Sequence, residues 1–525
     1  MDTKALRQKV LDLAIRGKLV PQNLNDEPAS VLLERIRQQK QQMVKEGKLK
    51  AKDIKNDSII YVGEDNLHYE KFADGTVKCI EDEIPFELPD GWAWARLGTV
   101  ADMALGKMLD AAKNKGSLRP YLRNINVRWG AFELSDVLEM RFEDDELDRY
   151  SICRGDLVIC EGGEPGRCAV WQSEEVVFYQ KALHRVRTIE ILPEYLYYVI
   201  AHFIASGQYE RYYTGTTIKH LTGQSLRILP VALPPINEQQ LIVKRLQNII
   251  EEIDKVETEK AETLSFVSLA KSKILDLAIR GQLVPQDPND EPASVLLERI
   301  RAEKEALIKA GKIKRDKKES VIFRGEDNSY YLLTSDNKSY DADVPFDIPD
   351  SWCWARLKDV FIINPRNKLD DELDVSFVPM PLIDDGYSGK HTAEKRRWKE
   401  VKTGFTHFAE GDVGVAKITP CFENRKSTVF ENLANGYGAG TTELHILRPY
   451  SNTILAQYLL AYVKSDYFVE NGKQTFTGAV GQQRIGKEYV EGAYFPLPPI
   501  QEQERIIQQL NTVFEYLNTI SDALS

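Results

Sequence analysis

The sequence has little cysteine and no long apolar run. Six cysteines among 525 residues are too sparse for a disulfide scaffold, and their spacing does not match a zinc site. No run reaches the roughly 18 uncharged apolar residues that a membrane span requires. The first 17 residues are amphipathic and lack the apolar core and cleavage site of a signal peptide. We therefore expect a cytoplasmic protein with no membrane partner.

Motifs for nucleotide, methyl-donor or metal chemistry are absent as well. Residues 106–107 lack the upstream glycine of a phosphate-binding loop, and no helix is expected after the glycine-rich segment 161–166. Two weak patterns remain. Residues 364–367 faintly resemble the Asn-Pro-Pro-aromatic motif of adenine methyltransferases, and Asp385 with 400–402 mimics a nuclease metal site. They leave a stand-alone methyltransferase or nuclease as the alternative to a chain without catalytic residues, metal or cofactor.

The chain contains a long internal repeat. Residues 11–37 and 275–301 are identical at 24 of 27 positions, at an offset of 264. Weaker matches at similar spacing pair the Trp-rich segment 84–97 with 344–357, and LPPINEQ with LPPIQEQ. Between these matches, about 98–232 and 358–496 do not resemble each other by eye. Two similar frames therefore hold two different inserts, which suits a protein that does one job on two targets.

Both frames end in a predicted helix with a coiled-coil-like apolar stripe. The central helix is predicted over Glu238–Arg280, with Ile242 and Leu246 on its stripe, and Ile506 and Leu510 begin the second stripe. We assign these four apolar residues to contacts with partner subunits. The chain stops where the second helix is half complete, and its N-terminus matches the missing half. We infer that the two terminal segments together rebuild one copy of the central helix; two independent tandem halves are the alternative.

The predicted fold class is α+β. Two globular mixed α/β domains are joined by two long antiparallel helices in a circular, pseudo-two-fold repeat. The predicted segments are 1–91, the N-terminal repeat with a basic helix and hairpin; 92–235, the first insert domain; 236–301, the central helix and repeat; 302–351, a basic helix and hairpin linker; 352–499, the second insert domain; and 500–525, the C-terminal helix.

Polar side chains cluster in the turns of both inserts. Arg, Asn, Gln, Lys and Thr are the residues that read base edges or bind phosphates. Each of them can equally be ordinary solvated surface, so what favours DNA reading is their clustering in loops that differ between equivalent frames. The candidates in the first insert are Arg119, Arg123, Asn124, Asn126, Arg128, Lys181, Thr216, Thr217, Lys219 and His220. Those in the second are Arg366, Asn367, Lys368, Arg396, Arg425, Lys426, Thr441, Gln474, Thr477, Gln483 and Arg484.

Two further stretches of the frames, 35–55 and 299–318, are rich in lysine and arginine. These stretches either approach phosphates or form a solvated helix face and the chain segment that follows the helix.

The repeated LDLAIRGxLVPQ helix, the NDEPASVLLERI segment and the closing LPPIxEQ resemble the specificity subunits of type I restriction-modification enzymes, the HsdS family. The resemblance covers the whole chain. It implies that each insert is a target recognition domain for one half of a bipartite, asymmetric site in double-stranded DNA, and that the helices set the gap between the halves.

The resemblance also implies the partners. Two methyltransferase subunits would modify adenine with S-adenosylmethionine, and two ATP-dependent translocase and nuclease subunits, which use ATP and magnesium, would carry out restriction. This chain would itself be non-catalytic. Its net charge of −11 departs from the simple expectation for a DNA-binding protein and predicts weak DNA binding without partners. A helical adaptor that binds only protein remains a third hypothesis.

Overall fold

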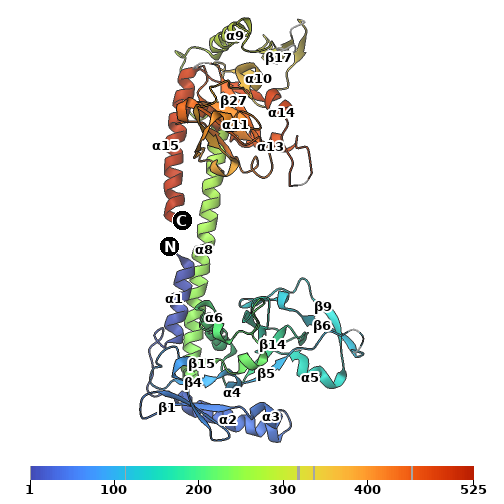
Figure 1. The fold of residues 1–525 in the computed structure, drawn as a ribbon, viewed down its shortest axis with the longest axis vertical. Coiled ribbons are helices and arrows are strands. Elements are labelled where there is room, and N and C mark those ends of the chain that lie inside the picture. The colour runs from blue at the N-terminus through green and yellow to red at the C-terminus, as the bar shows by residue number, and fades with distance from the viewer. Residues whose placement is uncertain are drawn as a thin grey trace. The chain divides into compact units, whose positions relative to one another are not determined.

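The computed structural model of the protein describes residues 2–110, 112, 114–315, 320–334, 337–450, 453–479 and 481–525. Two compact units make up the chain, unit 1 from Met1 to Glu259 and unit 2 from Lys260 to Ser525 (Figure 1). Lys317 and Lys318 of the second basic stretch lie outside the described residues. Within the described ranges, no helix combines the length and apolarity needed to cross a bilayer.

Unit 1 combines helices with several small sheets of two to four strands. Its helices are α1 (Thr3–Ile15), α2 (Ala29–Lys45), α3 (Ala51–Ile54), α4 (Leu97–Val100), α5 (Leu147–Tyr150), α6 (Pro193–Ala205), α7 (Gly223–Arg227) and the first part of α8 (Ile236–Ile279). Its strands are β1 (Ser58–Val62), β2 (His68–Phe72), β3 (Val77–Cys79), β4 (Ala93–Arg96), β5 (Ala101–Leu105), β6 (Ser117–Leu122), β7 (Val127–Arg128), β8 (Ala131–Phe132), β9 (Leu138–Phe142), β10 (Ser151–Ile152), β11 (Leu157–Cys160), β12 (Cys168–Val170), β13 (Val177–Tyr179), β14 (Leu183–Thr188) and β15 (Pro230–Leu233).

Unit 2 repeats much of this order. Its helices are the second part of α8, α9 (Ala293–Lys309), α10 (Leu357–Val360), α11 (Trp398–Val401), α12 (Ala456–Val463), α13 (Asp466–Lys473), α14 (Lys487–Gly492) and α15 (Ile500–Leu524). Its strands are β16 (Ser320–Arg324), β17 (Tyr330–Thr334), β18 (Ser339–Asp341), β19 (Cys353–Arg356), β20 (Phe361–Ile363), β21 (Asp374–Val378), β22 (Glu394–Arg397), β23 (Thr406–Ala409), β24 (Val413–Ala416), β25 (Ser427–Val429), β26 (Tyr437–Gly440), β27 (Leu444–Pro449) and β28 (Tyr494–Leu497).

A glycine ends the repeated helix in both frames. Gly17 follows α1 with φ 66°, and Gly281 follows α8 with φ 67°. A Cβ atom on Gly17 would lie 2.5 Å from Cγ of Pro89, and one on Gly281 would lie 2.4 Å from Cγ of Pro349. The left-handed backbone and the nearby proline ring therefore both favour glycine, which explains the repeated LDLAIRG.

The first and last strands of each insert pair with each other. β4 is antiparallel to β15 in unit 1, and β19 is antiparallel to β28 in unit 2. The Trp-rich opening and the Leu-Pro-Pro ending of each insert are thus brought together at one two-stranded sheet. Each insert leaves and re-enters its frame at the same place, so the loops between can vary without disturbing the frame.

The two inserts have the same sheet topology. In unit 1 the strand orders are β5-β14-β11-β12 and β9-β6-β13-β10, and in unit 2 they are β20-β27-β24-β25 and β22-β21-β26-β23. The parallel pair also matches, since β6 is parallel to β13 and β21 is parallel to β26. The mixed α/β class predicted for both inserts is confirmed, although their sequences do not resemble each other by eye.

A helix pair supports each insert. In unit 1, α1 runs antiparallel to the first part of α8, and Arg7 pairs with Asp254 and Glu257 near its start. In unit 2, α15 runs antiparallel to the second part of α8, where Nζ of Lys271 lies 2.6 Å from Oδ1 of Asn518. Figure 1 shows each pair side by side.

The predicted partner contacts on these helices need correction. Ile242 and Leu246 are fully buried in the core of unit 1, where α1 and the first insert cover them. Ile506 is fully buried in the core of unit 2, and Leu510 is 6% exposed there. These four side chains hold the chain's own helices against its inserts. They present almost no surface to another subunit, so their assignment as partner-binding residues is wrong.

Candidate nucleic-acid interface

A buried histidine anchors the final loop of each insert. Nε2 of His184 on β14 lies 3.0 Å from the carbonyl oxygen of Leu221, and Nε2 of His445 on β27 lies 3.3 Å from that of Ile485. Because a carbonyl oxygen only accepts hydrogen bonds, Nε2 is the donor in both rings. Burial lowers the pKa of both histidines, that of His184 to about 4. Both rings are therefore neutral at pH 7.

In unit 1, this anchor brings three polar segments together. The backbone N–H of Leu221 donates to the carbonyl of Glu161, and the N–H of Glu161 donates to the carbonyl of Ala182. Thr214 and His220 form a β-bridge that closes the loop between them. The glycine-rich turn, the β13–β14 turn and the final loop consequently border one open hollow of about 560 Å³.

Unit 2 has the same junction with different side chains. The backbone N–H of Ile485 donates to the carbonyl of Lys417, and the N–H of Lys417 donates to the carbonyl of Glu443. Thr477 and Arg484 form the β-bridge that matches Thr214 and His220. The same backbone scaffold thus presents a different polar surface in each unit, as expected for two readers of different targets.

Several predicted DNA contacts gather at these junctions. In unit 1, Lys181 and His220 line the hollow, and the Asn124 amide lies near Gly163, where an added Cβ would be 3.1 Å from its nitrogen. The final loop also carries exposed side chains, Thr216, Thr217 and Lys219. In unit 2, the junction collects Thr441, Thr477, Gln483 and Arg484.

Other candidates lie away from the junctions. Arg119 on β6 and Arg128 on β7 are exposed. Arg366 and Lys368 are exposed after β20, and Arg366 donates to the carbonyl of Phe405. Arg396 lies over the ring of Phe377 at 3.8 Å from its centroid, and Gln474 is exposed after α13.

A third group serves the fold and requires correction as base readers. Asn126 is 1% exposed and donates to the carbonyls of Glu133 and Asp136. Asn367 donates to the carbonyl of Phe408. These amide groups satisfy buried backbone, which leaves them unavailable to a base.

Three basic side chains are likewise held by their own unit. Arg123 donates to the carbonyl of Asp136 and pairs with its carboxylate. Arg425, at φ 57°, donates to the carbonyl of Lys464 and pairs with Asp466. Lys426 donates to the carbonyl of Ile383 at 2.7 Å. These contacts stabilise the loops, and DNA contact by the same three side chains stays a prediction.

Two residues at the junctions were not predicted from the sequence. Glu443 pairs with Arg484 through two hydrogen bonds, and the side chain of Leu109 borders the unit 1 hollow while being 60% exposed. Acidic and apolar side chains do not bind phosphates, so residue type alone did not mark these two as candidates. An acidic residue that can pair with a candidate arginine is the signal that could have identified Glu443.

Residues of the two weak enzyme patterns make contacts that stabilise the fold. Oδ1 of Asn364 accepts the backbone N–H of Ile446 at 2.9 Å, and Nζ of Lys402 pairs with Asp371 at 2.8 Å. Among the described residues, no group of three or more His, Cys, Asp or Glu could hold a metal ion. The geometry therefore gives the stand-alone nuclease and methyltransferase hypotheses no support.

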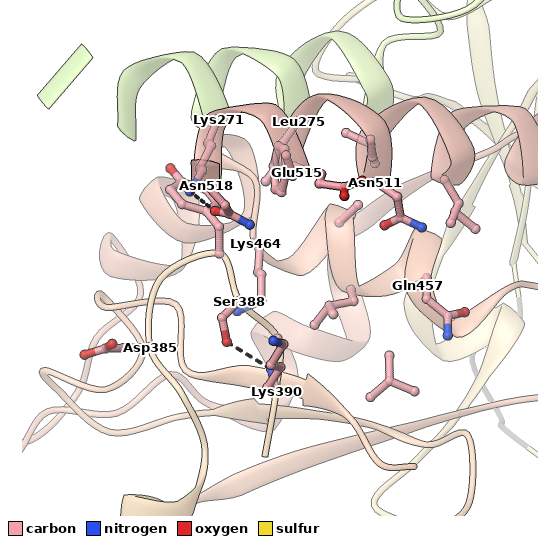
Figure 2. A pocket seen from close by; sticks show the side chains of 18 of the residues that line it. Lys271, Leu275, Asp385, Ser388, Lys390, Gln457, Lys464, Asn511, Glu515 and Asn518 are labelled. Atoms are coloured by element: carbon pink, nitrogen blue, oxygen red, sulfur yellow. Dashed lines mark hydrogen bonds between the residues drawn. The ribbon is translucent and has the colours of Figure 1, made fainter. Parts of the chain in front are cut away.

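A second hollow, of about 750 Å³, lies where the second insert meets α8 and α15 in unit 2 (Figure 2). None of the residues that line it is a predicted DNA contact. Lys464 in its wall is 3% exposed, and its Nζ donates to the carbonyls of Gly386 and Arg425. Burial lowers the pKa of Lys464 to about 7. This hollow belongs to the attachment of the insert, not to the polar junction.

Comparison with known proteins agrees with this arrangement. Residues 89–264 match the model of the type I restriction modification DNA specificity domain. The chain is 49% identical over 235 residues to the type I restriction enzyme EcoAI specificity subunit of Escherichia coli, a match that covers 45% of this chain and 37% of that protein. It is 47% identical over 235 residues to the EcoEI specificity subunit of Escherichia coli, with the same coverage. The chain thus spans little more than a third of the length of these two relatives.

A solved structure is similar in fold. A chain from the structure described as "Structural basis underlying complex assembly and conformational transition of the type I R-M system" matches with a TM-score of 0.55 and 17% identity, over 84% of this chain and 94% of that one. Residues 89–264 thus match the type I restriction modification DNA specificity domain, and the chain is similar over 235 residues to type I specificity subunits.

Proposed function

We propose that the chain is the DNA sequence-specificity subunit of a type I restriction-modification complex. Each insert reads one half of a bipartite, asymmetric site through the major groove, and the chain directs adenine methylation and restriction by partner subunits. The observation that carries this proposal is the matched junction. One backbone scaffold, anchored by His184 or His445, presents His220 in one unit and Arg484 in the other.

The chemistry resides in the partners under this proposal. Two methyltransferase subunits hold S-adenosylmethionine, and two translocase and nuclease subunits use ATP and magnesium. The target adenine must leave the duplex for methylation, so the pocket for the flipped base belongs to a methyltransferase subunit. This chain contributes position and sequence choice, and it performs no turnover itself.

We also propose that the chain closes on itself. In unit 1 a terminal helix pairs with α8, and in unit 2 the other terminal helix does so. At the repeat offset, α15 corresponds to the first part of α8 and α1 to its last part. The two terminal helices together therefore supply a second copy of α8, and the helices set the gap between the two half-sites.

Weak binding to DNA by the isolated chain is part of the proposal. Several basic side chains are paired with carboxylates, among them Arg35 with Glu27 and Lys402 with Asp371. Together with the net charge of −11, this pairing leaves few charges for phosphates. The partner subunits must supply much of the phosphate contact, and the affinity of the whole complex for DNA should fall steeply with salt.

Exchange of an insert tests the proposal. Residues 98–232 are replaced by the corresponding insert of another specificity subunit, and methylated adenines are mapped by single-molecule sequencing in cells that carry the partner subunits. One half of the methylated motif should change and the other should remain. A change in both halves, or the absence of any bipartite motif with the unaltered chain, would disprove modular reading.

A further inference from the structure

We propose that Arg484 is a specificity-determining residue of unit 2 that reads a guanine, and that His220 occupies the same reading position in unit 1. The inference rests on the proposed function and adds to it a residue and a base. It follows from the hydrogen bonds of one guanidinium and from the equivalence of two backbone positions.

Glu443 holds the guanidinium of Arg484 along one side. Nε of Arg484 lies 2.9 Å from Oε2 of Glu443, and Nη2 lies 3.0 Å from Oε1. Nη1 donates to the carbonyl of Gln482 at 2.7 Å. A guanidinium has five N–H groups, and these three bonds use one on each nitrogen. Among the described contacts, one N–H therefore remains on each terminal nitrogen.

The remaining pair of donors matches guanine. In the major groove, guanine presents two adjacent acceptors, O6 and N7, and a bidentate arginine contact is the commonest way to read them. The Arg484 side chain is 40% exposed, so a base edge can reach it. Glu443 holds the long side chain in one orientation before DNA arrives, which reduces the conformational entropy lost on binding.

The charge of Glu443 suits this role. The hydrogen bond from Arg484 lowers the pKa of Glu443, so its carboxylate is ionised at pH 7 and keeps the guanidinium in place. The carboxylate also offsets the positive charge of Arg484, which makes a contact to phosphate less favourable than one to a neutral base edge.

His220 occupies the equivalent backbone position. Arg484 and His220 each form a β-bridge with a threonine, Thr477 or Thr214. His220 directly precedes Leu221, and Arg484 directly precedes Ile485. The carbonyls of Leu221 and Ile485 accept hydrogen bonds from the two buried histidines. The His220 ring lies beside Gly162, where an added Cβ would be 2.9 Å from Nδ1, so the glycine leaves room for the ring. A different side chain at the same point gives the two units different base preferences.

Arg425, another candidate of unit 2, is less suited to this reading. The guanidinium of Arg425 is held through both terminal nitrogens by the carbonyl of Lys464 and by Asp466. Its side chain is 16% exposed. Arg425 is therefore much less accessible to a base edge than Arg484, whose side chain is 40% exposed.

The test uses the complete complex in cells, with methylated adenines mapped by single-molecule sequencing. Exchange of 358–496 first identifies the half-site that unit 2 reads. Arg484→Ala and Arg484→Lys should then relax one guanine of that half by roughly 5- to 150-fold in relative methylation, with the other half unchanged. Lysine keeps the positive charge but lacks the paired N–H donors of a guanidinium. The variant therefore separates base reading from phosphate binding. Arg324→Ala is the matched control, because its side chain is also 40% exposed and paired with a carboxylate.

The possible outcomes separate the two proposals. If Arg484→Lys preserves the guanine, or if the half read by unit 2 contains no guanine, the reading role is disproved while the proposed function stands. If Arg484→Ala abolishes methylation through misfolding, the specificity of Arg484→Lys alone tests the reading role. If the unaltered complex methylates no bipartite motif, the proposed function itself fails. In unit 1, His220→Ala should relax only the opposite half.

Discussion

The indole nitrogen of Trp92 lies 2.9 Å from a carboxylate oxygen of Glu238, so the start of the first insert is hydrogen-bonded to the first turn of the helix that follows the insert. Trp352 and Glu502 repeat the contact at 2.8 Å in unit 2. Burial raises the pKa of both carboxyl groups, and the indole N–H partly offsets the cost of burying them. The repeated tryptophan therefore joins insert to frame.

Replacement of Trp92 by phenylalanine should destabilise unit 1. Phenylalanine keeps an aromatic ring in part of the site, but Glu238 loses its donor and becomes a buried acceptor without a partner, which costs about 1–3 kcal/mol. Hydrogen exchange of the full chain, resolved by peptide, should show faster exchange in unit 1 only. Trp352→Phe is the control and should affect unit 2 alone; equal exchange in both units with either variant would contradict the assignment.

Acid should loosen the junction of unit 1 through His184. Burial lowers the pKa of His184 from 6.5 to about 4, so the folded state binds its proton later than the unfolded state does. The stabilisation is therefore complete above pH 6.5 and is lost as pH falls toward 4, by roughly 2–3 kcal/mol between pH 7 and 4.5. His184→Gln keeps a donor for Leu221 and removes the titration. Its melting temperature should fall less on acidification than that of the unaltered protein, and an equal fall would refute the role of His184.

Lys464 should make the stability of unit 2 rise with pH as well, but over a more alkaline range. Burial lowers its pKa from 10.5 to about 7, and a neutral amine has two N–H groups for its two carbonyl acceptors. The unfolded chain holds the extra proton between pH 7 and 10.5, so the stability of unit 2 should rise across that range. Lys464→Met should weaken this rise in thermal unfolding between pH 7 and 9.5. Lys390→Met, at an exposed site of the same hollow, should leave it unchanged.

The internal repeat allowed much of the fold to be predicted. Identity at 24 of 27 positions implies one local structure used twice, and the glycines at 17 and 281 do adopt the same backbone with the same proline contact. The alternating strands and the following helix of each insert were also predictable, because side-chain periodicity reports which face is buried. The matched strand order of the inserts could not be predicted from the sequence, because it depends on pairings between segments that are distant in the chain.

The site was predicted less well, for two physical reasons. An apolar stripe indicates that a helix face is covered, but it does not reveal what covers it, and Ile242 is covered by its own unit. Residue type likewise does not reveal how exposed a side chain is: Arg425 and Arg484 look alike in sequence, yet the Arg425 side chain is 16% exposed and the Arg484 side chain is 40% exposed. Both distinctions depend on contacts between segments far apart in the chain.

Shortening the helices should change the gap between half-sites without changing the bases that are read, if the proposed function and closure are right. Removal of 257–263 from α8, together with 519–525 from α15, deletes two helical turns and keeps the phase of a seven-residue stripe. Two turns correspond to about 10 Å, or roughly three base pairs at 3.4 Å per pair. The methylated motif should therefore keep both halves and lose about three base pairs of spacer. Removal of 519–525 alone leaves α8 intact and should keep the original spacing; a changed half-site in either variant would show that the helices do more than set distance.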